Sequence, residues 1–433
     1  MRVLLASDYY PPYIGGAQIQ THLLAKQLTA RGHVISVATV WQDDLPSYER
    51  ADGIDVHRLR QLRTLPIFTR RQFQHHQPPF PDPVTAVALR RLIKRFKPDI
   101  VHSYGWISYA AAAALLGTSI PLLLTARDYG YGCAKRTLVY HDEICSGPRL
   151  AKCLGCAGRA YGTPKGWIAA TGVIASRPLL RRRTSAVHSI SSYVLEAVRR
   201  DFLHARGSTS DQVIHDVIGS APPARAEAAP SVSTRSVLQQ LPGEPFMLFV
   251  GAFRRVKGVP ELLAAYQSLV DPPPLVMIGT MEPDSPASFP PGVRVILDAP
   301  NEAVLAAASA PHCLFGVMPS VLPEPFGTVV CEVMSCGKPV IGTKPGGHTD
   351  MIENGRSGLL VPRANVEALA AAMQELIDDE ELRTRLGREA LKSARRFTPD
   401  RLVPRIEHLY ELIIARDGMG AAGNLRPTHE VAP

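Results

Sequence analysis

The feature that most constrains the fold of this 433-residue chain is an alternation of short apolar runs with helix-like segments, in two series. The first run, RVLLAS at 2–7, lacks polar–apolar alternation, and the segment after it carries leucines at helical spacing up to Gly32. Uninterrupted apolar strands separated by helices are typical of α/β folds, in which helices cover both faces of a parallel sheet. The remaining predicted strands are 34–40, 54–59, 99–104, 120–126 and 185–191 in the first series, and 246–251, 275–279, 293–297, 313–320 and 338–343 in the second.

A composition break separates the two series. The stretch SAPPARAEAAPSVSTRS is rich in Ala, Pro and Ser and is typical of a linker. A chain of this length also exceeds one compact core, so we expect two Rossmann-like domains with ligands bound between them, at the carboxyl ends of the strands. The expected units are an N-terminal domain (1–219), a linker (220–240), a C-terminal domain (241–398), a terminal helix (399–416) and a flexible tail (417–433).

The charge is divided unevenly between the two halves. Residues 1–220 hold 28 Lys and Arg against 15 Asp and Glu, whereas residues 221–433 hold 20 against 24. The N-terminal half is therefore the one expected to meet an anionic partner. Nucleic acid is not expected, since no zinc-finger spacing, RNA-binding aromatic motif or heptad-bearing basic helix accompanies the charge. A membrane surface remains a candidate.

No run of about 18 apolar residues is present, so we expect no transmembrane helix. The N-terminal apolar run is too short for the core of a signal peptide. The sequence therefore predicts a cytoplasmic protein, with the inner face of the membrane as its peripheral surface.

Two glutamates in the stretch PEPFGTVVCEV are the first candidate site residues. Glu324 precedes a predicted helix that begins near Gly327, and Glu332 lies inside that helix, with seven residues between the two glutamates. A helix N-terminus attracts anions because its N–H groups are free and its dipole end is positive. Glu332 is suited to accept hydrogen bonds from a vicinal diol such as ribose, and Glu324 from sugar hydroxyls.

A second element supplies positive charge. The segment VGAFRRVKG combines the end of a predicted strand with a loop that carries Arg254, Arg255 and Lys257. Such a loop is suited to neutralise a diphosphate. Together with the two glutamates, it predicts a site for a nucleoside diphosphate sugar.

These motifs resemble those of the retaining glycosyltransferases of family 4, which have the GT-B fold of two Rossmann-like domains facing across a cleft. The resemblance covers residues 1–415 and is strongest in the E-x(7)-E signature with its Phe-Gly and Gly-Gly elements. It implies that Glu324 contacts the donor sugar, Glu332 the ribose and Lys257 the diphosphate, with no catalytic metal. It further implies that the helix near 400–416 crosses back to the N-terminal domain. The remaining donor-site positions that it implies are Gly16, Phe326, Gly327 and Thr328.

Three positions depart from the family pattern. Ala252 stands where most members have an arginine, so Arg254 or Arg255 is expected to replace that charge. Arg127 stands where the family often has a catalytic-site histidine, and a fixed cation there is suited to stabilise negative charge or to orient a phosphorylated acceptor. Asp350 takes the place of the family's glutamate after the Gly-Gly turn.

The sequence therefore predicts a hexosyltransferase that moves a sugar from a nucleotide donor to a saccharide, one that is lipid-linked or at the cell surface, as in polysaccharide assembly. An epimerase or hydrolase of nucleotide sugars on the same fold is one alternative, and a transferase acting on a soluble small molecule is another. A non-catalytic binding module is a third. His102, in DIVHSY, is either catalytic or a support for the strand end.

Four of the seven cysteines form a cluster: Cys133, Cys145, Cys153 and Cys156. Their spacing is compatible with a structural zinc bound by four thiolates, and four unliganded thiols are the alternative. The cluster follows the segment TARDYGYG, so it is expected to brace a loop on the acceptor side of the cleft.

The segment PKGWIAATGVIASRPLLRRR at 164–183 joins an aromatic, apolar residues and basic ends. That composition suits a helix lying on an anionic bilayer. The alternative is a helix packed into the core whose arginines are merely solvated.

Overall fold

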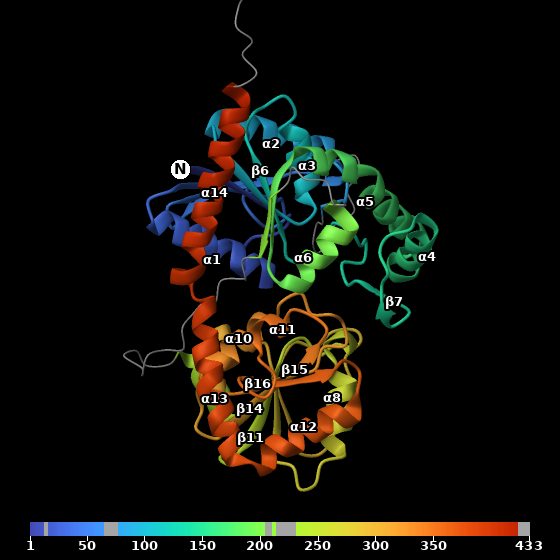
Figure 1. Cartoon of the computed structure of the whole chain (residues 1–433), viewed down its shortest axis with the longest axis vertical. Coiled ribbons are helices and arrows are strands. Elements are labelled where there is room, and N and C mark those ends of the chain that lie inside the picture. The colour runs from blue at the N-terminus through green and yellow to red at the C-terminus, as the bar shows by residue number, and fades with distance from the viewer. Residues whose placement is uncertain (13–15, 65–76, 204–209, 214–230, 423–433) are drawn as a thin grey trace, which may run out of the picture.

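The computed structural model describes residues 1–12, 16–64, 77–203, 210–213 and 231–422, which form two α/β domains stacked one above the other (Figure 1). Each domain holds one large sheet with helices on both faces. The GT-B architecture expected from the sequence is therefore confirmed.

The N-terminal sheet has eight strands in the order β10-β9-β6-β5-β1-β2-β4-β3. All neighbours pair in parallel except β3, which runs antiparallel to β4 at the edge. The strands are β1 (Arg2–Ser7), β2 (Val34–Val40), β3 (Tyr48–Ala51), β4 (Ile54–Leu59), β5 (Ile100–Tyr104), β6 (Leu122–Ala126), β9 (Thr184–Ser189) and β10 (Ser210–Val213). The helices of this domain are α1 (Gly16–Ala30), α2 (Pro83–Phe96), α3 (Ile107–Ala114), α4 (Leu150–Tyr161), α5 (Thr163–Arg183) and α6 (Ser192–Val198). A two-residue hairpin, β7 (Val139–Tyr140) with β8 (Glu143–Ile144), lies outside the main sheet.

The C-terminal sheet has six parallel strands in the order β13-β12-β11-β14-β15-β16. They are β11 (Phe246–Val250), β12 (Leu275–Gly279), β13 (Val293–Leu297), β14 (Cys313–Met318), β15 (Val340–Lys344) and β16 (Gly358–Pro362). The helices are α7 (Val232–Gln239), α8 (Val259–Gln267), α9 (Asn301–Ser309), α10 (Thr328–Ser335), α11 (His348–Met351), α12 (Val366–Asp378), α13 (Glu380–Ala394) and α14 (Pro399–Ala422).

The order of strands fixes where ligands can bind. In each sheet the chain starts at a middle strand, builds outward to one side and then crosses to the other, so β1/β5 and β11/β14 are the points where the direction reverses. Side chains and helix N-termini leave a crevice at such a point, beyond the carboxyl ends of the strands. The two crevices are the places to look for a site.

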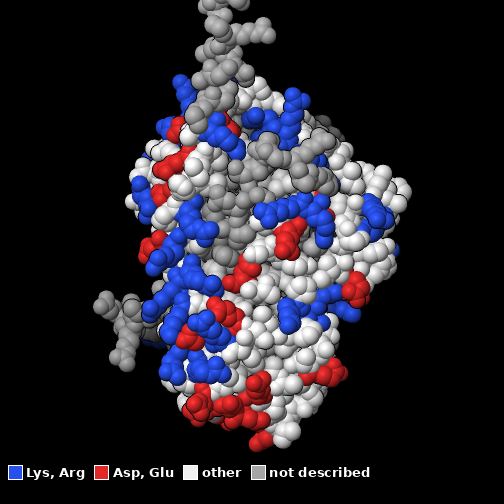
Figure 2. Space-filling model, viewed as in Figure 1, with Lys and Arg blue, Asp and Glu red and all other residues white. Residues whose placement is uncertain are grey.

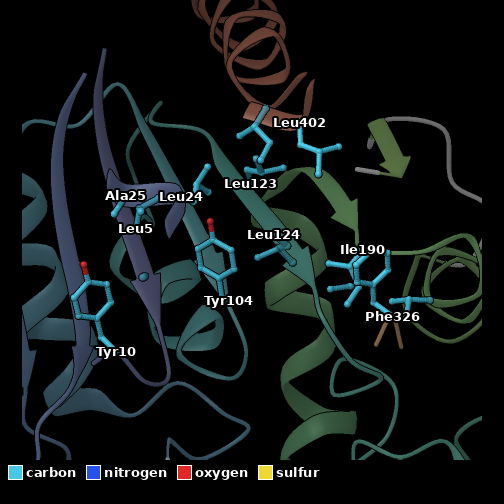
Figure 3. Close-up of a cluster of buried hydrophobic side chains, with 14 of the residues drawn as sticks. Leu5, Tyr10, Leu24, Ala25, Tyr104, Leu123, Leu124, Ile190, Phe326 and Leu402 are labelled. Atoms are coloured by element: carbon cyan, nitrogen blue, oxygen red, sulfur yellow. The ribbon is translucent and has the colours of Figure 1, made fainter. Parts of the chain in front are cut away.

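The central strands are fully buried, as their uninterrupted apolar sequences require. One cluster of buried side chains continues across both domains (Figure 3). In that view Leu402 of α14 lies beside Leu123 of β6, and Phe326 of the C-terminal domain lies beside Ile190 of the N-terminal domain. The domains therefore share apolar contacts as well as facing each other.

Helix α14 lies along the N-terminal domain although it follows the C-terminal one (Figure 1). Glu407 accepts hydrogen bonds from Arg31 (2.8 Å) and pairs with His33 (2.7 Å). The hydroxyl of Tyr410 pairs with Nδ1 of buried His102 at 2.7 Å. His102 is thus enclosed in the sheet and supports the docking of α14.

The structure corrects two expected boundaries and adds five strands. The interval 220–240 is not wholly a linker, because α7 occupies Val232–Gln239 and packs against α9. The last helix extends six residues past Arg416, to Ala422. Five short strands were not expected: β3, β7, β8, β10 and β16. Among the described residues, no helix is long and apolar enough to span a membrane.

Candidate functional site

A cavity of about 360 Å³ opens between the domains at the β11/β14 crevice. Arg127 and Ile190 line it from the N-terminal side. From the C-terminal side the lining comprises the ends of β11 and β14, the loop 324–327 and the first turn of α10. Of the residues expected in the donor site, Lys257, Glu324, Phe326, Gly327 and Thr328 contribute to this lining, and so does Arg127, which was expected to act from the N-terminal side.

Glu324 and Lys257 form an ion pair in the cavity. Lys257 Nζ donates to Oε2 at 2.9 Å and to Oε1 at 3.1 Å, and the hydroxyl of Ser320 donates to Oε2 at 2.7 Å. Burial alone would raise the pKa of Glu324, but Lys257 and His348, with these hydrogen bonds, hold that pKa below its ordinary value. Glu324 is therefore an ionised acceptor fixed in orientation, and Lys257 is a cation held at the cavity wall.

His348 is a cavity residue that the sequence analysis did not single out. The backbone N–H of Thr343 donates to its Nδ1 at 3.1 Å, so the neutral ring carries its proton on Nε2. Burial lowers the pKa of His348 to about 4, which keeps the ring neutral near pH 7. Nε2 lies on the side of Gly327, which also lines the cavity. The only sequence signal was the position of this residue directly after the Gly-Gly turn.

Two glycines make the loops of the site fit together. Gly327 begins α10 with φ of 93°, a left-handed conformation, and an added Cβ would lie 2.9 Å from Nε2 of His348. Gly347 lies so close to the loop of Glu324 that a Cβ would stand 2.3 Å from the carbonyl oxygen of Pro325. The Phe-Gly and Gly-Gly elements are therefore two halves of one packed loop pair, which aims the N–H groups of α10 into the cavity.

Glu332 does not line the cavity in the described structure. It is 7% exposed and accepts a hydrogen bond from Nδ2 of Asn301, at the start of α9, at 2.9 Å. Burial raises the pKa of Glu332 above its ordinary value. The carboxyl group thus connects α10 to the start of α9, and Glu332 comes one helical turn after Thr328, which lines the cavity.

Arg254 and Arg255 are exposed and are not among the lining residues. Arg254 Nε pairs with Asp284 at 3.1 Å, and the backbone N–H of Arg255 binds the same carboxylate. Lys257 is thus the residue of this loop that reaches the cavity. Gly16 begins α1, but the loop 13–15 before it lies outside the described residues.

A second recess lies at the β1/β5 crevice of the N-terminal domain. Asp8 follows β1 and accepts the backbone N–H groups of Trp106 (3.0 Å) and Ile107 (2.7 Å). Arg136 bridges the carboxylates of Asp8 (3.4 Å) and Asp128 (2.7 Å). Burial raises the pKa of Asp8 despite the neighbouring Arg136. Asp8 and Arg136 were not singled out from the sequence, although Asp8 comes directly after the first strand.

Arg127 connects the two recesses, because it lines both the cavity between the domains and the recess at Asp8. Its guanidinium lies 5.1 Å above the ring of Tyr104, which fixes its direction. A third cavity, of about 380 Å³, continues from Asp8 and Arg136 toward Arg63, Lys165 and Ile168. The N-terminal domain therefore offers a cationic and partly apolar space next to the donor-side cavity.

Direct hydrogen bonds join the domains around the site. The hydroxyl of Tyr129 donates to the carbonyl of Pro323 at 2.9 Å, and that of Ser191 donates to the carbonyl of Pro325 at 2.5 Å. Asp350 accepts from the backbone N–H of Ser192 at 2.8 Å. Asp350, which stands where the family has a glutamate, thus makes a contact between the domains.

Comparison with known proteins identifies the family. A family model described as "Glycosyl transferase 4-like domain" matches residues 15–208, and one described as "Glycosyl transferases group 1" matches residues 233–393. An uncharacterized glycosyltransferase of Methanocaldococcus jannaschii is 23% identical over 97% of this chain and 100% of its own length. A D-inositol 3-phosphate glycosyltransferase of Corynebacterium glutamicum is 30% identical over 40% of this chain and 44% of its own length.

Solved structures agree with the fold. Sucrose-phosphate synthase from Thermosynechococcus elongatus superposes with a TM-score of 0.71 at 20% identity, over 96% of this chain and 99% of that one. HepE of Anabaena, solved in complex with UDP-glucose, gives 0.63 at 16% identity, over 98% and 100%. With its two family matches and the GT-B fold, the chain belongs to the family 4 glycosyltransferases, enzymes that depend on nucleotide sugars.

Proposed function

We propose that this protein transfers a hexose from a nucleoside diphosphate sugar to a hydroxyl of a lipid-linked or cell-surface saccharide, with retention of the anomeric configuration. The observation that carries the proposal is the cavity between the domains, where Lys257, Glu324 and His348 surround the N-terminus of α10. These groups provide a fixed cation, an ionised acceptor, a neutral donor and free backbone N–H groups.

The arrangement suits a diphosphate leaving group. As the bond to the anomeric carbon breaks, negative charge grows on the diphosphate, and Lys257 and the N-terminus of α10 are already oriented toward it. Glu324 accepts from hydroxyls of the sugar, and His348 donates to it. Arg127, which reaches both cavities, orients the acceptor or a phosphate on it. Retention follows the family resemblance and is part of the proposal.

A donor screen tests the proposed reaction. Full-length protein is incubated with UDP-, GDP- and ADP-sugars, with and without a membrane lipid extract, and products are measured by mass spectrometry. We expect one donor to release its nucleoside diphosphate and to yield a glycosylated product only when the extract is present. Nucleotide release that needs no acceptor would identify a hydrolase. Conversion of the donor sugar would identify an epimerase. Product formed only with soluble sugars would contradict a lipid-linked acceptor.

Glu332→Ala is expected to weaken binding of the nucleoside diphosphate by a factor of about ten to a hundred, since a charged acceptor for the ribose diol is worth about 1.5–3 kcal/mol. Calorimetry with the free nucleotide measures this. Glu375→Ala, an exposed change on α12, is the control and should bind as the parent does. An unchanged dissociation constant for Glu332→Ala would remove this residue from the ribose site.

The membrane-binding surface that we propose covers a smaller part of the segment 164–183 than the sequence suggested. The arginine run is partly engaged, because Arg181 donates to the carbonyl of Leu203 and Arg183 to that of Ile120. Val173 and Leu180 are buried in the domain, so the packed-helix alternative holds for this half of α5. Trp167 and Ile168, at the other end of α5, are 52% and 56% exposed.

Positive charge accompanies this exposed apolar pair. Lys165 lies one turn away on α5, and Figure 2 shows Lys and Arg spread over the N-terminal domain while Asp and Glu gather at the far end of the C-terminal domain. Ile168 and Lys165 also line the cavity that continues to Asp8. A bilayer held at this end of α5 would present its lipid-linked acceptor next to that cavity.

Sedimentation with anionic vesicles tests the membrane surface. The parent protein is expected to sediment at low salt, and Trp167→Ser/Ile168→Ser to reduce the bound fraction at least about fivefold, because two apolar anchors of about 1 kcal/mol or more each are lost. Val270→Ser removes a more exposed apolar side chain (77%) from the other domain and should change nothing. If the parent stays in the supernatant at low salt, the peripheral membrane role is wrong.

A further inference from the structure

We propose that Cys133, Cys145, Cys153 and Cys156 bind one structural zinc ion, which fastens the lobe formed by residues 133–161 to the N-terminal domain. Three separate segments bring these thiols together. Cys133 lies in the turn after β6, where its N–H donates to Tyr129, and Cys145 follows β8, where its N–H donates to Leu138. Cys153 and Cys156 are one turn apart on α4 and so lie on one face of that helix.

All four cysteines line the same small, partly open pocket, whose volume is about 20 Å³. A space of this size admits about one water-sized body. The pocket is therefore of a size that suits a single ion. None of the four thiols is in a disulfide.

Tetrahedral binding by four thiolates at about 2.3 Å is the usual structural zinc site. In the described part of the chain, no three His, Cys, Asp or Glu side chains are already grouped as a metal site. The cysteine side chains must therefore turn toward the centre of the space that they line, and their protons pass to water when zinc binds.

The apolar contacts between the lobe and α5 are few and small. The buried apolar cluster there joins Ala134 and Ala157 of the lobe to Ala169, Ala170 and Val173 of α5, while Leu138 packs into the main core. A unit with so small a core commonly needs a disulfide or a metal. The loop between Cys133 and Cys145 also holds four non-glycine residues with left-handed backbone: Arg136, Leu138, His141 and Asp142. Such residues persist only where the surroundings fix them.

The lobe also contacts both halves of the site. A zinc ion that fixes the lobe would therefore also fix the residues of the site that the lobe contacts. The N–H of Arg136 donates to the carbonyl of Cys133 at 3.0 Å, so the cysteine turn sets the position of the guanidinium that bridges Asp8 and Asp128. Across the cleft, Arg363 of the C-terminal domain donates to the carbonyl of Asp142 at 3.0 Å and pairs with Glu143 at 3.1 Å. A fixed lobe thus defines the acceptor side of the cleft and one of its contacts with the donor domain.

Elemental analysis of full-length, tag-free protein, purified without chelator and dialysed against zinc, tests the site. We expect about one zinc per chain and no iron. Replacement by Co²⁺ should give the thiolate-to-cobalt absorption band of a four-sulfur site. Zinc below about 0.2 per chain with all four thiols titratable, iron in place of zinc, or two disulfides in protein kept under reductant would each overturn the proposal.

Variants locate the ion. Cys153→Ser/Cys156→Ser should lower bound zinc to near zero, whereas Cys336→Ser, a half-buried cysteine in the other domain, should keep it. Zinc loss should increase the rate of proteolytic cleavage within 133–161 at least about tenfold, while nucleotide binding to the parent and the variant stays equal. Zinc retained by the double variant would place the metal elsewhere. Because the metal measurement needs no substrate, its outcome is independent of the proposed transferase activity.

Discussion

Lys257→Ala is expected to lower kcat at least about a hundredfold, the usual effect of removing one fixed charge from a developing anion. Lys257 is the cation of the VGAFRRVKG loop that lines the cavity, since Arg254 pairs with Asp284 and points away. Steady-state kinetics with the donor found in the screen would measure the loss. The fold should survive, because the side chain is 35% exposed and the pair with Glu324 is worth about 1 kcal/mol after screening.

The control for this change is Lys94→Ala, which removes a lysine from the exposed face of α2. Thermal unfolding of both variants should resemble that of the parent. If turnover of Lys257→Ala remains within a few-fold of the parent, the diphosphate is held by other groups, and the arrangement of the donor site proposed above is wrong.

Glu324→Gln is the second change with a large expected effect. The amide keeps the size of the side chain but cannot carry the negative charge that Lys257 and Ser320 orient in the cavity. We expect kcat to fall about a hundredfold, with a smaller change in the dissociation constant of the free nucleotide. Glu411→Gln, on the exposed side of α14, should leave both values unchanged.

The effects of Lys257→Ala and Glu324→Gln on kcat should not be additive as free energies. Glu324 and Lys257 form one ion pair, so each single variant already disturbs the partner, and the double variant should lose less than the product of the two single losses. Fully multiplicative losses would show that the two side chains act independently. That result would contradict the view of the pair as one unit.

The sequence identified the sheets because their central strands are uninterrupted apolar runs, a pattern that few other structures share. It missed β3, β7, β8, β10 and β16, which have two to five residues each and lie at sheet edges or outside the sheets. Such strands depend on pairing with a neighbour, and their composition carries little signal.

Likewise, some residues of the site were predicted from the sequence and others were not. The loop around Glu324 lies next to the helix that it precedes, so local sequence was enough to place it. His348 reaches the cavity only through the packing of the Gly-Gly turn against that loop, and Arg254 turns away because Asp284, thirty residues later, pairs with it. Contacts of this kind join segments far apart in the chain, and no local pattern reports them.

The course of the chain between the domains limits how the cleft can move. The chain leaves the C-terminal domain after α13, and α14 then lies on the N-terminal domain (Figure 1). Rotation of the C-terminal domain at the junction between α13 and α14 would open the cleft. The contacts of Tyr129, Ser191 and Asp350 would separate together in such a rotation. Deleting α14 would remove the segment that ties the C-terminal domain to the N-terminal sheet through this junction.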